Sequence, residues 1–417
     1  MKILLLGSGA REHALARALV NAPETTELVV APGNPGTAMI ATNFAIDPTS
    51  PVEAVELATQ MGADLVVVGP EAPLVAGVAD AVRQAGVPVF GPGAAAARLE
   101  GSKAFAKEVM AAAGVPTATA VVCATPEELS AALDRFGAPY VVKDDGLAAG
   151  KGVVVTSERD AALAHGRSCL ARQDGRVLVE EYLDGPEVSL FCVCDGATVR
   201  PLAPAQDYKR VGDGDVGPNT GGMGSYSPLT WAPADLTEQV VREVAQPVVD
   251  EMARRGTSFT GLLYCGLALT GKGLRVVEFN VRFGDPETQV VLARLTSSLA
   301  QLLHAAATGR LAEVPAPTWR PEAAVDVVLA APGYPGAVTT GGLLTGLDAA
   351  EEVEGVHVLH AGTGFSDDGE LVATGGRVLS VVALGDDVQA ARERAYQAVG
   401  RLGLPGSHYR TDIAAGR

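Results

Sequence analysis

The sequence has little positive charge and no long apolar run. Its 417 residues carry 32 Lys and Arg against 49 Asp and Glu, a net charge of −17. Such a chain repels phosphate backbones and anionic lipids at long range, so we expect no nucleic-acid partner and no membrane partner. No stretch approaches the roughly 18 consecutive apolar residues of a membrane-spanning helix. The apolar run at the amino terminus is also too short for a signal peptide, which predicts a cytoplasmic protein.

Cysteine is scarce as well. The five cysteines are odd in number and include no C-x-x-C pair, so neither a disulfide scaffold nor a zinc ribbon is indicated. The six histidines show no metal-ligand spacing, which argues against a catalytic zinc site. By contrast, 47% of the residues are hydrophobic, and the length predicts two to four domains at roughly 150 residues each.

Short apolar runs alternate with amphipathic stretches over the first hundred residues. This alternation is typical of a doubly wound parallel sheet. A proline-rich linker at 312–321 precedes what we expect to be a small closing α/β domain. The expected strands are 3–6, 28–31, 65–68, 87–90, 120–123, 140–143, 152–156, 177–183, 187–194, 262–269, 274–282, 324–330, 356–360, 371–374 and 378–384. The expected helices are 12–20, 51–61, 76–85, 103–113 and 237–255, the last bent or interrupted at Pro247.

A glycine-rich turn follows the first expected strand, in the run Gly7-Ser8-Gly9-Ala10-Arg11-Glu12. A dinucleotide fingerprint also needs a third small residue and an acidic residue at the end of the second strand. Both are missing, so a nicotinamide oxidoreductase is disfavoured. Whether the turn binds a phosphate or sugar or is purely structural stays open.

A second glycine-rich segment connects two expected strands and carries lysines. Its glycines let the backbone approach phosphates closely, and its lysines supply point charges. It is not a Walker A loop, because Gly152 stands where that motif needs Ser or Thr. An ordinary glycine-rich β-turn is the alternative. The candidate ATP-binding residues here are Lys143, Gly146, Gly150, Lys151 and Gly152.

Lysine is rare in this chain, which makes its placement informative. Only seven lysines occur, and four of them (Lys103, Lys143, Lys151 and Lys209) fall in candidate motifs. Lys103 opens a helix, where a cation opposes the helix dipole unless an anion binds there. A solvated lysine is the alternative for Lys103.

Three polar residues alternate along a late strand, and an acidic turn follows them. Glu278, Asn280 and Arg282 would share one face of a strand, because successive side chains alternate. Carboxylate and amide oxygens suit Mg²⁺, and an arginine can stabilise a transferring phosphoryl group. A half-exposed edge strand is the alternative.

Weaker candidates lie in turns and loops. The expected strand 177–183, which contains Glu180, Glu181 and Leu183, runs into a turn before Glu187; this segment could meet an adenine and its ribose. An ordinary charged turn is the alternative. The Gly, Asn and Asp-rich loop 207–224 is either a closing substrate loop or a flexible surface excursion. Its candidate substrate-binding residues are Asp207, Lys209, Arg210 and Gly222; a later turn adds Arg377 as a candidate for a monophosphate.

Taken in order, these motifs resemble the phosphoribosylamine–glycine ligase family of the ATP-grasp superfamily. The match runs nearly end to end and includes GSGAREHALA, VAPGNPGT, LEGSKAF, DGLAAGKGV, VEEYLDGPE, DYKRVGDGDVGPNTGGMG, EFNVRFGDPETQ and TGGRVL. The resemblance implies an N-terminal Rossmann-like domain (1–100), an ATP-grasp domain (101–322) with an inserted lid subdomain at about 120–190, and a C-terminal α/β domain (323–417).

The resemblance also implies the reaction, in which ATP, glycine and 5-phosphoribosylamine give glycinamide ribonucleotide, ADP and phosphate through glycyl phosphate in purine biosynthesis. Mg²⁺ or Mn²⁺ would be bound by Glu278 and Asn280. A monomer or weak dimer is expected. By resemblance, the catalytic residues are Arg282, Asp285 and Lys143, the nucleotide contacts include Glu180, Glu181, Leu183 and Glu187, and Glu71, Asp285 and Arg377 meet the phosphoribosylamine.

Two features of the sequence depart from the family pattern, and three rival functions stay open. Asp144 stands where the family more usually has a small Ala. The strand 262–269 lacks the further acidic metal ligand that many ATP-grasp enzymes carry, so the ligands of a second metal are not identified. The rivals are a related ligase with another acid or amine, a nicotinamide oxidoreductase, and a nucleotide-binding regulatory protein without catalysis.

Overall fold

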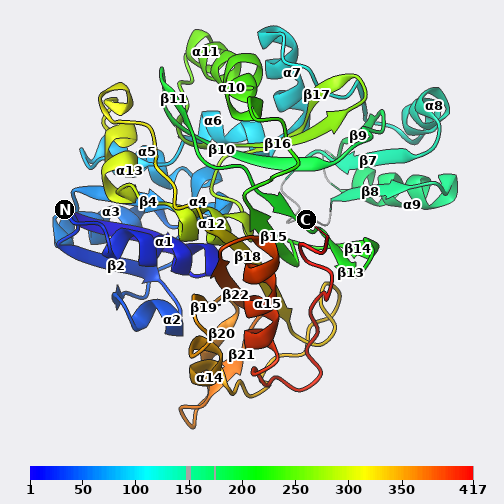
Figure 1. The fold of residues 1–417 in the computed structure, drawn as a ribbon. Coiled ribbons are helices and arrows are strands. Elements are labelled where there is room, and N and C mark those ends of the chain that lie inside the picture. Colours follow the sequence, from blue (N-terminus) through cyan, green and yellow to red (C-terminus); the bar gives the residue numbers. More distant parts are fainter. Residues whose placement is uncertain (147–151, 173–174, 417) are drawn as a thin grey trace.

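A computed structural model of the chain describes residues 1–146, 152–172 and 175–416 (Figure 1). Within these residues the strands form four sheets of four or five strands and two small two-stranded ribbons. Across the same residues, no helix has both the length and the apolar character that crossing a bilayer requires.

The amino-terminal region is a parallel five-stranded sheet in the order β3-β2-β1-β4-β5, as the alternating pattern predicts. The expected helix 76–85 is present as a single helix over 78–84. The structure adds three short elements that were not expected, the helices 35–38 and 71–75 and the edge strand 42–43. Each has at most five residues, too few to give a periodic signal. The strands are β1 (Lys2–Gly7), β2 (Glu27–Pro32), β3 (Thr42–Asn43), β4 (Leu65–Val68) and β5 (Val89–Phe90); the helices are α1 (Ala10–Val20), α2 (Pro35–Ala38), α3 (Pro51–Met61), α4 (Glu71–Val75) and α5 (Val78–Gln84).

An antiparallel four-stranded sheet in the order β6-β9-β7-β8 projects to one side of the molecule with two helices, in the region expected to be the lid (Figure 1). Its own small core includes Leu129, Leu133, Val142 and Val179. The strand expected to reach residue 183 ends at Glu180. The elements are β6 (Ala120–Cys123), α8 (Pro126–Phe136), β7 (Tyr140–Asp144), β8 (Val153–Thr156), α9 (Arg159–Leu170) and β9 (Val177–Glu180).

A second antiparallel sheet, in the order β11-β10-β16-β17, packs against helices. The helical segment near Pro247 is continuous but widens to a π-turn, η1 (Val241–Ala245), just before the proline, which lacks the N–H of a normal helical bond. The expected interruption therefore lies before Pro247. The elements are α6 (Ala94–Gly101), α7 (Lys103–Ala113), β10 (Glu187–Asp195), β11 (Val199–Pro201), α10 (Leu236–Val240), α11 (Gln246–Arg254), β16 (Thr260–Thr270) and β17 (Gly273–Asn280).

The carboxyl-terminal sheet joins distant parts of the chain in the order β12-β15-β18-β22-β19. Strands β12 and β15 precede residue 228, so this sheet spans the expected boundary at 322/323. The strands of this sheet are β12 (Gln206–Asp207), β15 (Gly224–Ser227), β18 (Ala323–Ala330), β19 (Val356–His360) and β22 (Arg377–Gly385). The two ribbons pair β13 (Arg210–Gly212) with β14 (Val216–Asn219) and β20 (Thr363–Phe365) with β21 (Leu371–Ala373). The helices are α12 (Glu287–Arg294), α13 (Leu299–Ala307), a 3₁₀ turn (Leu311–Glu313), α14 (Leu347–Glu351) and α15 (Val388–Val399).

Candidate active site

A buried carboxylate holds two lysines where the lid meets the second sheet. Glu180, at the end of β9, accepts from Lys143 Nζ at 2.8 Å through Oε2 and from Lys107 Nζ at 3.0 Å through Oε1. Burial alone raises the pKa of Glu180, but the charges of Lys143 and Lys107 bring it below its usual value. Lys143 and Glu180, two candidates from the sequence, therefore belong to one cluster. The side chain of Glu180 links Lys143 to Lys107.

Lys143 also reaches the strand that carries the candidate metal ligands. Its Nζ donates to Val277 O at 3.0 Å. The ladder between β16 and β17 shifts register beside Val277, a bulge that interrupts the normal pairing there. The irregular strand thus supplies an acceptor that fixes Lys143 next to Glu278.

The second glycine-rich segment lies partly outside the described residues, which exclude Gly150 and Lys151. Its described ends are ordered by backbone contacts. Gly146 O accepts from Lys103 Nζ at 3.0 Å, and Gly152 O accepts from the backbone N–H of Asp144 at 2.7 Å. Lys103, at the start of α7, is therefore hydrogen-bonded to the lid hairpin, which disfavours the alternative of a solvated lysine.

Glu278 and Asn280 lie on one face near the end of β17. Burial favours a raised pKa for Glu278, yet nearby cations hold it below its ordinary value. Glu278 is therefore an ionised carboxylate at neutral pH. The cations that act on it, in decreasing order of effect, are Lys209, Lys143, Lys103 and Arg282.

These two oxygen donors fit a hard divalent cation. Among the described residues, Glu278 has no hydrogen bond to its carboxylate, and no group of three or more His, Cys, Asp or Glu side chains is arranged to hold a metal. Mg²⁺ typically takes one or two protein ligands and completes its shell with water and phosphate oxygens. Glu278 and Asn280 match that pattern. No ligands of a second metal are identified.

Arg282 lies just beyond β17, so the expectation that it continues the strand face is wrong. β17 ends at Asn280, and the chain bends there. The guanidinium of Arg282 still contacts Asn280, donating to Oδ1 at 3.3 Å. It also forms ion pairs with Glu71 at 3.2 Å and with Glu100 at 2.9 Å. Burial lowers the pKa of Arg282, but the two carboxylates raise it above its usual value, so the side chain stays charged.

Glu187 and Lys209 come together although one was expected at the nucleotide and the other at the second substrate. Lys209 Nζ lies 2.6 Å from Glu187 Oε2. Burial raises the pKa of nearby Asp207 to about 7; Lys209 opposes this shift and Glu287 adds to it. Arg210 lies in a β-hairpin, where it donates to Gly217 O at 2.7 Å. The structure therefore does not place Arg210 with these residues, and its role stays a prediction.

The loop 207–224 is tied to the carboxyl-terminal segment. Arg410 is 1% exposed and contacts Asp215 at 2.7 Å, Asp412 at 2.6 Å and Arg210 O at 3.1 Å. The hairpin of β13 and β14 is thus anchored, which disfavours the alternative of a flexible surface excursion.

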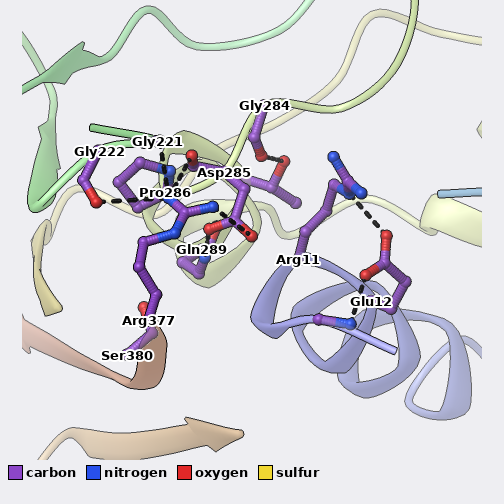
Figure 2. A network of polar contacts seen from close by, with 12 residues as sticks. Arg11, Glu12, Gly221, Gly222, Gly284, Asp285, Pro286, Gln289, Arg377 and Ser380 are labelled. Carbon is purple, nitrogen blue, oxygen red and sulfur yellow. Dashed lines mark hydrogen bonds and ion pairs between the residues drawn. The ribbon is translucent and has the colours of Figure 1, made fainter. Parts of the chain in front are cut away.

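Arg377 clamps this loop to the acidic turn at Asp285 (Figure 2). Its Nη1 donates to Gly221 O at 2.7 Å and to Asp285 O at 2.8 Å, and its Nη2 lies 3.3 Å from Asp285 Oδ2. Gly222 has a φ of +115°, and a Cβ there would lie 2.3 Å from Pro286, so the close approach requires glycine. Arg377 and Asp285 lie together as expected, and a role in binding phosphate stays a prediction.

The glycine-rich turn after β1 is filled by the chain's own carboxylate (Figure 2). Glu12 Oε2 accepts from the N–H of Gly9 at 2.7 Å, and Glu12 Oε1 accepts from Arg11 at 2.6 Å. A Cβ on Gly7 would lie 2.5 Å from Glu12 Cγ. Glu12 therefore takes the anion position at the start of α1, where a cofactor pyrophosphate would otherwise bind. This contact weighs against the oxidoreductase alternative.

The linker after β9 was expected to contact adenine through its backbone groups. The N–H of Glu181 is already used, because it donates to Thr119 O at 3.0 Å. The backbone N–H of Leu183 has no hydrogen-bond partner among the described residues. Recognition of adenine by this segment stays a prediction.

Sequence reasoning missed two charged residues of the site, Lys107 and Glu100. Lys107 is one of the seven lysines, and that scarcity was a usable signal. Glu100 accepts from the N–H of Val281 at 2.8 Å through one oxygen and pairs with Arg282 through the other. Glu100 stands close to Lys103 in the sequence, but nothing local indicated a role for it. Its partner Val281 is 181 positions further along the chain.

The chain matches family models over most of its length. Models described as the N domain, the ATP-grasp (A) domain and the C domain of phosphoribosylglycinamide synthetase match residues 1–100, 101–288 and 324–416. The chain belongs to the phosphoribosylglycinamide synthetase family. The expected family and fold class are thus confirmed.

Individual relatives support this assignment to the phosphoribosylglycinamide synthetase family. A phosphoribosylamine–glycine ligase of Streptomyces coelicolor is 63% identical over 100% of this chain and 99% of its own. The crystal structure of a phosphoribosylamine–glycine ligase from Thermotoga maritima superposes with a TM-score of 0.86 at 34% identity, covering 99% of this chain and 100% of that one. A biotin carboxylase domain from Hydrogenobacter thermophilus (TM-score 0.70, 18% identity, 98% of this chain and 91% of that one) shares the fold alone.

Asp144, the departure from the family pattern, forms an ion pair with Arg172 and is 4% exposed. Arg172 is 61% exposed, so this pair contributes at most about 1 kcal/mol. We expect Asp144→Ala to leave kcat within about twofold and to lower the KM for ATP or leave it unchanged, because it removes a negative charge near the lid hairpin. Steady-state kinetics test this. Arg172→Ala is the matched control, since it keeps the carboxylate and should not lower KM; a large loss of kcat in Asp144→Ala would contradict the expectation.

Proposed function

We propose that the chain is an ATP-dependent ligase that joins glycine to 5-phosphoribosylamine, giving glycinamide ribonucleotide, ADP and phosphate in purine biosynthesis. One observation carries this proposal: Lys143 is bonded to Val277 O beside Glu278, and Lys103 is bonded to Gly146 O on the lid hairpin. The charges of both lysines and of Lys209 lower the pKa of Glu278. Cations gathered around an acidic oxygen ligand suit a nucleoside triphosphate bound with a metal. The names of the relatives support the choice of substrates.

In the proposed reaction, the glycine carboxylate attacks the γ-phosphorus of ATP and ADP leaves. The amine of phosphoribosylamine then attacks the carbonyl carbon of glycyl phosphate, phosphate leaves, and the nitrogen loses a proton. Lys103 and Lys143 bind the phosphate chain, and Gly146, Gly150, Lys151 and Gly152 are the further residues proposed to bind ATP. Because both the acyl phosphate and phosphoribosylamine hydrolyse readily, the lid must exclude water and hold the two reactants in contact.

Other side chains position the reactants. Glu71 and Glu100 fix Arg282, whose charge stabilises the transferring phosphoryl group. Glu187 binds the ribose of ATP, and Lys209 holds its carboxylate in place. Asp285, Arg377 and Gly222 shape the phosphoribosylamine site, with Asp207 and Arg210 near the same loop.

Glu278 and Asn280 are the residues that would hold Mg²⁺ or Mn²⁺. When bound, the metal neutralises phosphate charge. A monomer or weak dimer and a cytoplasmic location remain predictions.

ADP release with substrates omitted in turn tests the proposal. Phosphoribosylamine is generated in situ from ribose 5-phosphate and ammonia, and Mg-ATP and glycine are supplied. We expect ADP only when glycine and the amine source are both present, with glycinamide ribonucleotide detected by mass. ADP formation that ignores glycine but depends on another acid in an amino-acid panel would identify a related ligase instead. ATP binding without any turnover would favour a regulatory protein.

A further inference from the structure

A cavity of about 310 Å³ is lined by side chains that have no role in the candidate active site. Its walls come from α1, α12, the start of α13, β19 and β22, where the amino-terminal region meets the carboxyl-terminal sheet (Figure 1). The volume is at the lower end of small-molecule sites, which span about 300–1,000 Å³. No Asp or Glu is among the described residues that line it. In a chain with a net charge of −17, that absence is unusual.

The ionisable lining is basic and lacks partners. Arg17, Arg320 and His357 line the cavity, and within the described parts of the chain none of their side chains forms a hydrogen bond or an ion pair. The Nε of Arg320 is buried without any acceptor. Burial is the main cause that lowers the pKa of His357 to about 4, and the charges of Arg17 and Arg320 contribute to this shift, so both arginines act on His357. By contrast, Arg282 and Arg377 of the candidate active site are each paired with carboxylates.

Glu24 and Glu351 do not form ion pairs with this group. Glu24 accepts from Ser298 Oγ at 2.6 Å, and Glu351 accepts from the N–H of Val358 at 3.2 Å. Glu351 acts on Arg17 only from beyond ion-pair distance, and burial of Arg17 outweighs it, so the pKa of Arg17 is lowered. Two guanidinium groups in one partly buried space are costly unless an anion joins them.

The cavity also adjoins the candidate active site. Gln289 lines it, is 1% exposed, and donates its Nε2 to Asp285 Oδ1 at 2.8 Å. The Oε1 of Gln289 is buried without a donor. The side chain of Gln289 therefore connects the cavity directly to Asp285.

We propose that this cavity binds a phosphate-type oxyanion, either free or carried on a small metabolite, through Arg17 and Arg320. Guanidinium groups bind phosphate with paired N–H donors, and Arg17 and Arg320 both line this cavity. The inference concerns binding alone and does not depend on the proposed reaction.

Calorimetric titration of the full-length protein with inorganic phosphate tests the inference. We expect binding that becomes at least about tenfold weaker in Arg17→Ala and in Arg320→Ala, since each loses a charged hydrogen bond. Binding should persist in Arg377→Ala, which removes the arginine expected at the active-site phosphate, and in Arg242→Ala, an exposed control on η1. Ribose 5-phosphate in the same titration distinguishes the two sources: tighter binding than phosphate indicates a metabolite, and equal or weaker binding indicates the free anion.

Binding that is lost in Arg377→Ala and intact in both cavity variants would place the anion in the active site and overturn the inference. No binding of either probe to the unaltered protein would overturn it as well. Because an arginine variant can lose stability, crystals of the unaltered protein soaked in phosphate provide a second measurement. Anion density between Arg17 and Arg320 is the expected result, and density confined to other places contradicts it.

Discussion

Glu278→Gln is expected to lower kcat by at least about a hundredfold, the effect of removing one charged group that acts on a developing transition state. The substitution keeps the size of the side chain and removes the negative charge. Around it, Lys209, Lys143 and Lys103 would lose the carboxylate they face, and the proposed metal would lose its only anionic ligand from the protein among the described residues. Glycine-dependent ADP release across a range of Mg²⁺ concentrations measures the effect.

Two comparisons make the Glu278 result specific. Glu238→Gln makes the same chemical change at an exposed position on α10 and should leave kcat unaltered. If Glu278 is a metal ligand, raised Mg²⁺ or Mn²⁺ should recover part of the lost activity in Glu278→Gln. Activity within a fewfold of the unaltered enzyme at every metal concentration would remove Glu278 from the proposed mechanism.

Those parts of the fold that depend on local periodicity were predictable from the sequence. The helices Pro51–Met61 and Lys103–Ala113 and the strand Ala120–Cys123 have the predicted bounds, because each combines a regular apolar pattern with clear end signals. Ser50 and Ser102 cap the two helices, and Gly62 and Gly114 end them in left-handed conformations. The π-turn before Pro247 was not predictable, since several backbone adjustments can accommodate a proline.

The candidate site was predictable as a set of residues and not as a set of contacts. The motifs identified Lys143, Glu180, Glu187 and Lys209 but assigned the last two to different substrates. Their ion pair joins residues 22 positions apart, and the pair of Arg282 with Glu100 joins residues 182 positions apart. Such pairings depend on how the lid, the second sheet and the amino-terminal region meet, which local patterns do not encode.

Lys143→Met is expected both to lose at least about a hundredfold in kcat and to lower stability by about 3–5 kcal/mol. The stability loss follows from Glu180, which is 3% exposed and would keep only one of its two lysines. The loss of turnover has a separate cause: Lys143 also bonds Val277 O and acts on Glu278, beside the proposed phosphates. Thermal unfolding measures the first effect, and ADP release well below the unfolding temperature measures the second.

Lys107→Met separates the two effects, because Lys107 pairs with the other oxygen of the same Glu180. It also bonds Thr117 Oγ1 and Ala118 O, so its loss should cost stability on a similar scale. Lys107 is not among the four cations with the largest effect on Glu278, and we therefore expect the kcat of Lys107→Met to stay within about tenfold of the unaltered enzyme. Equal losses of kcat in both variants would mean that turnover follows the integrity of the Glu180 cluster, and that Lys143 does not act on the phosphates directly.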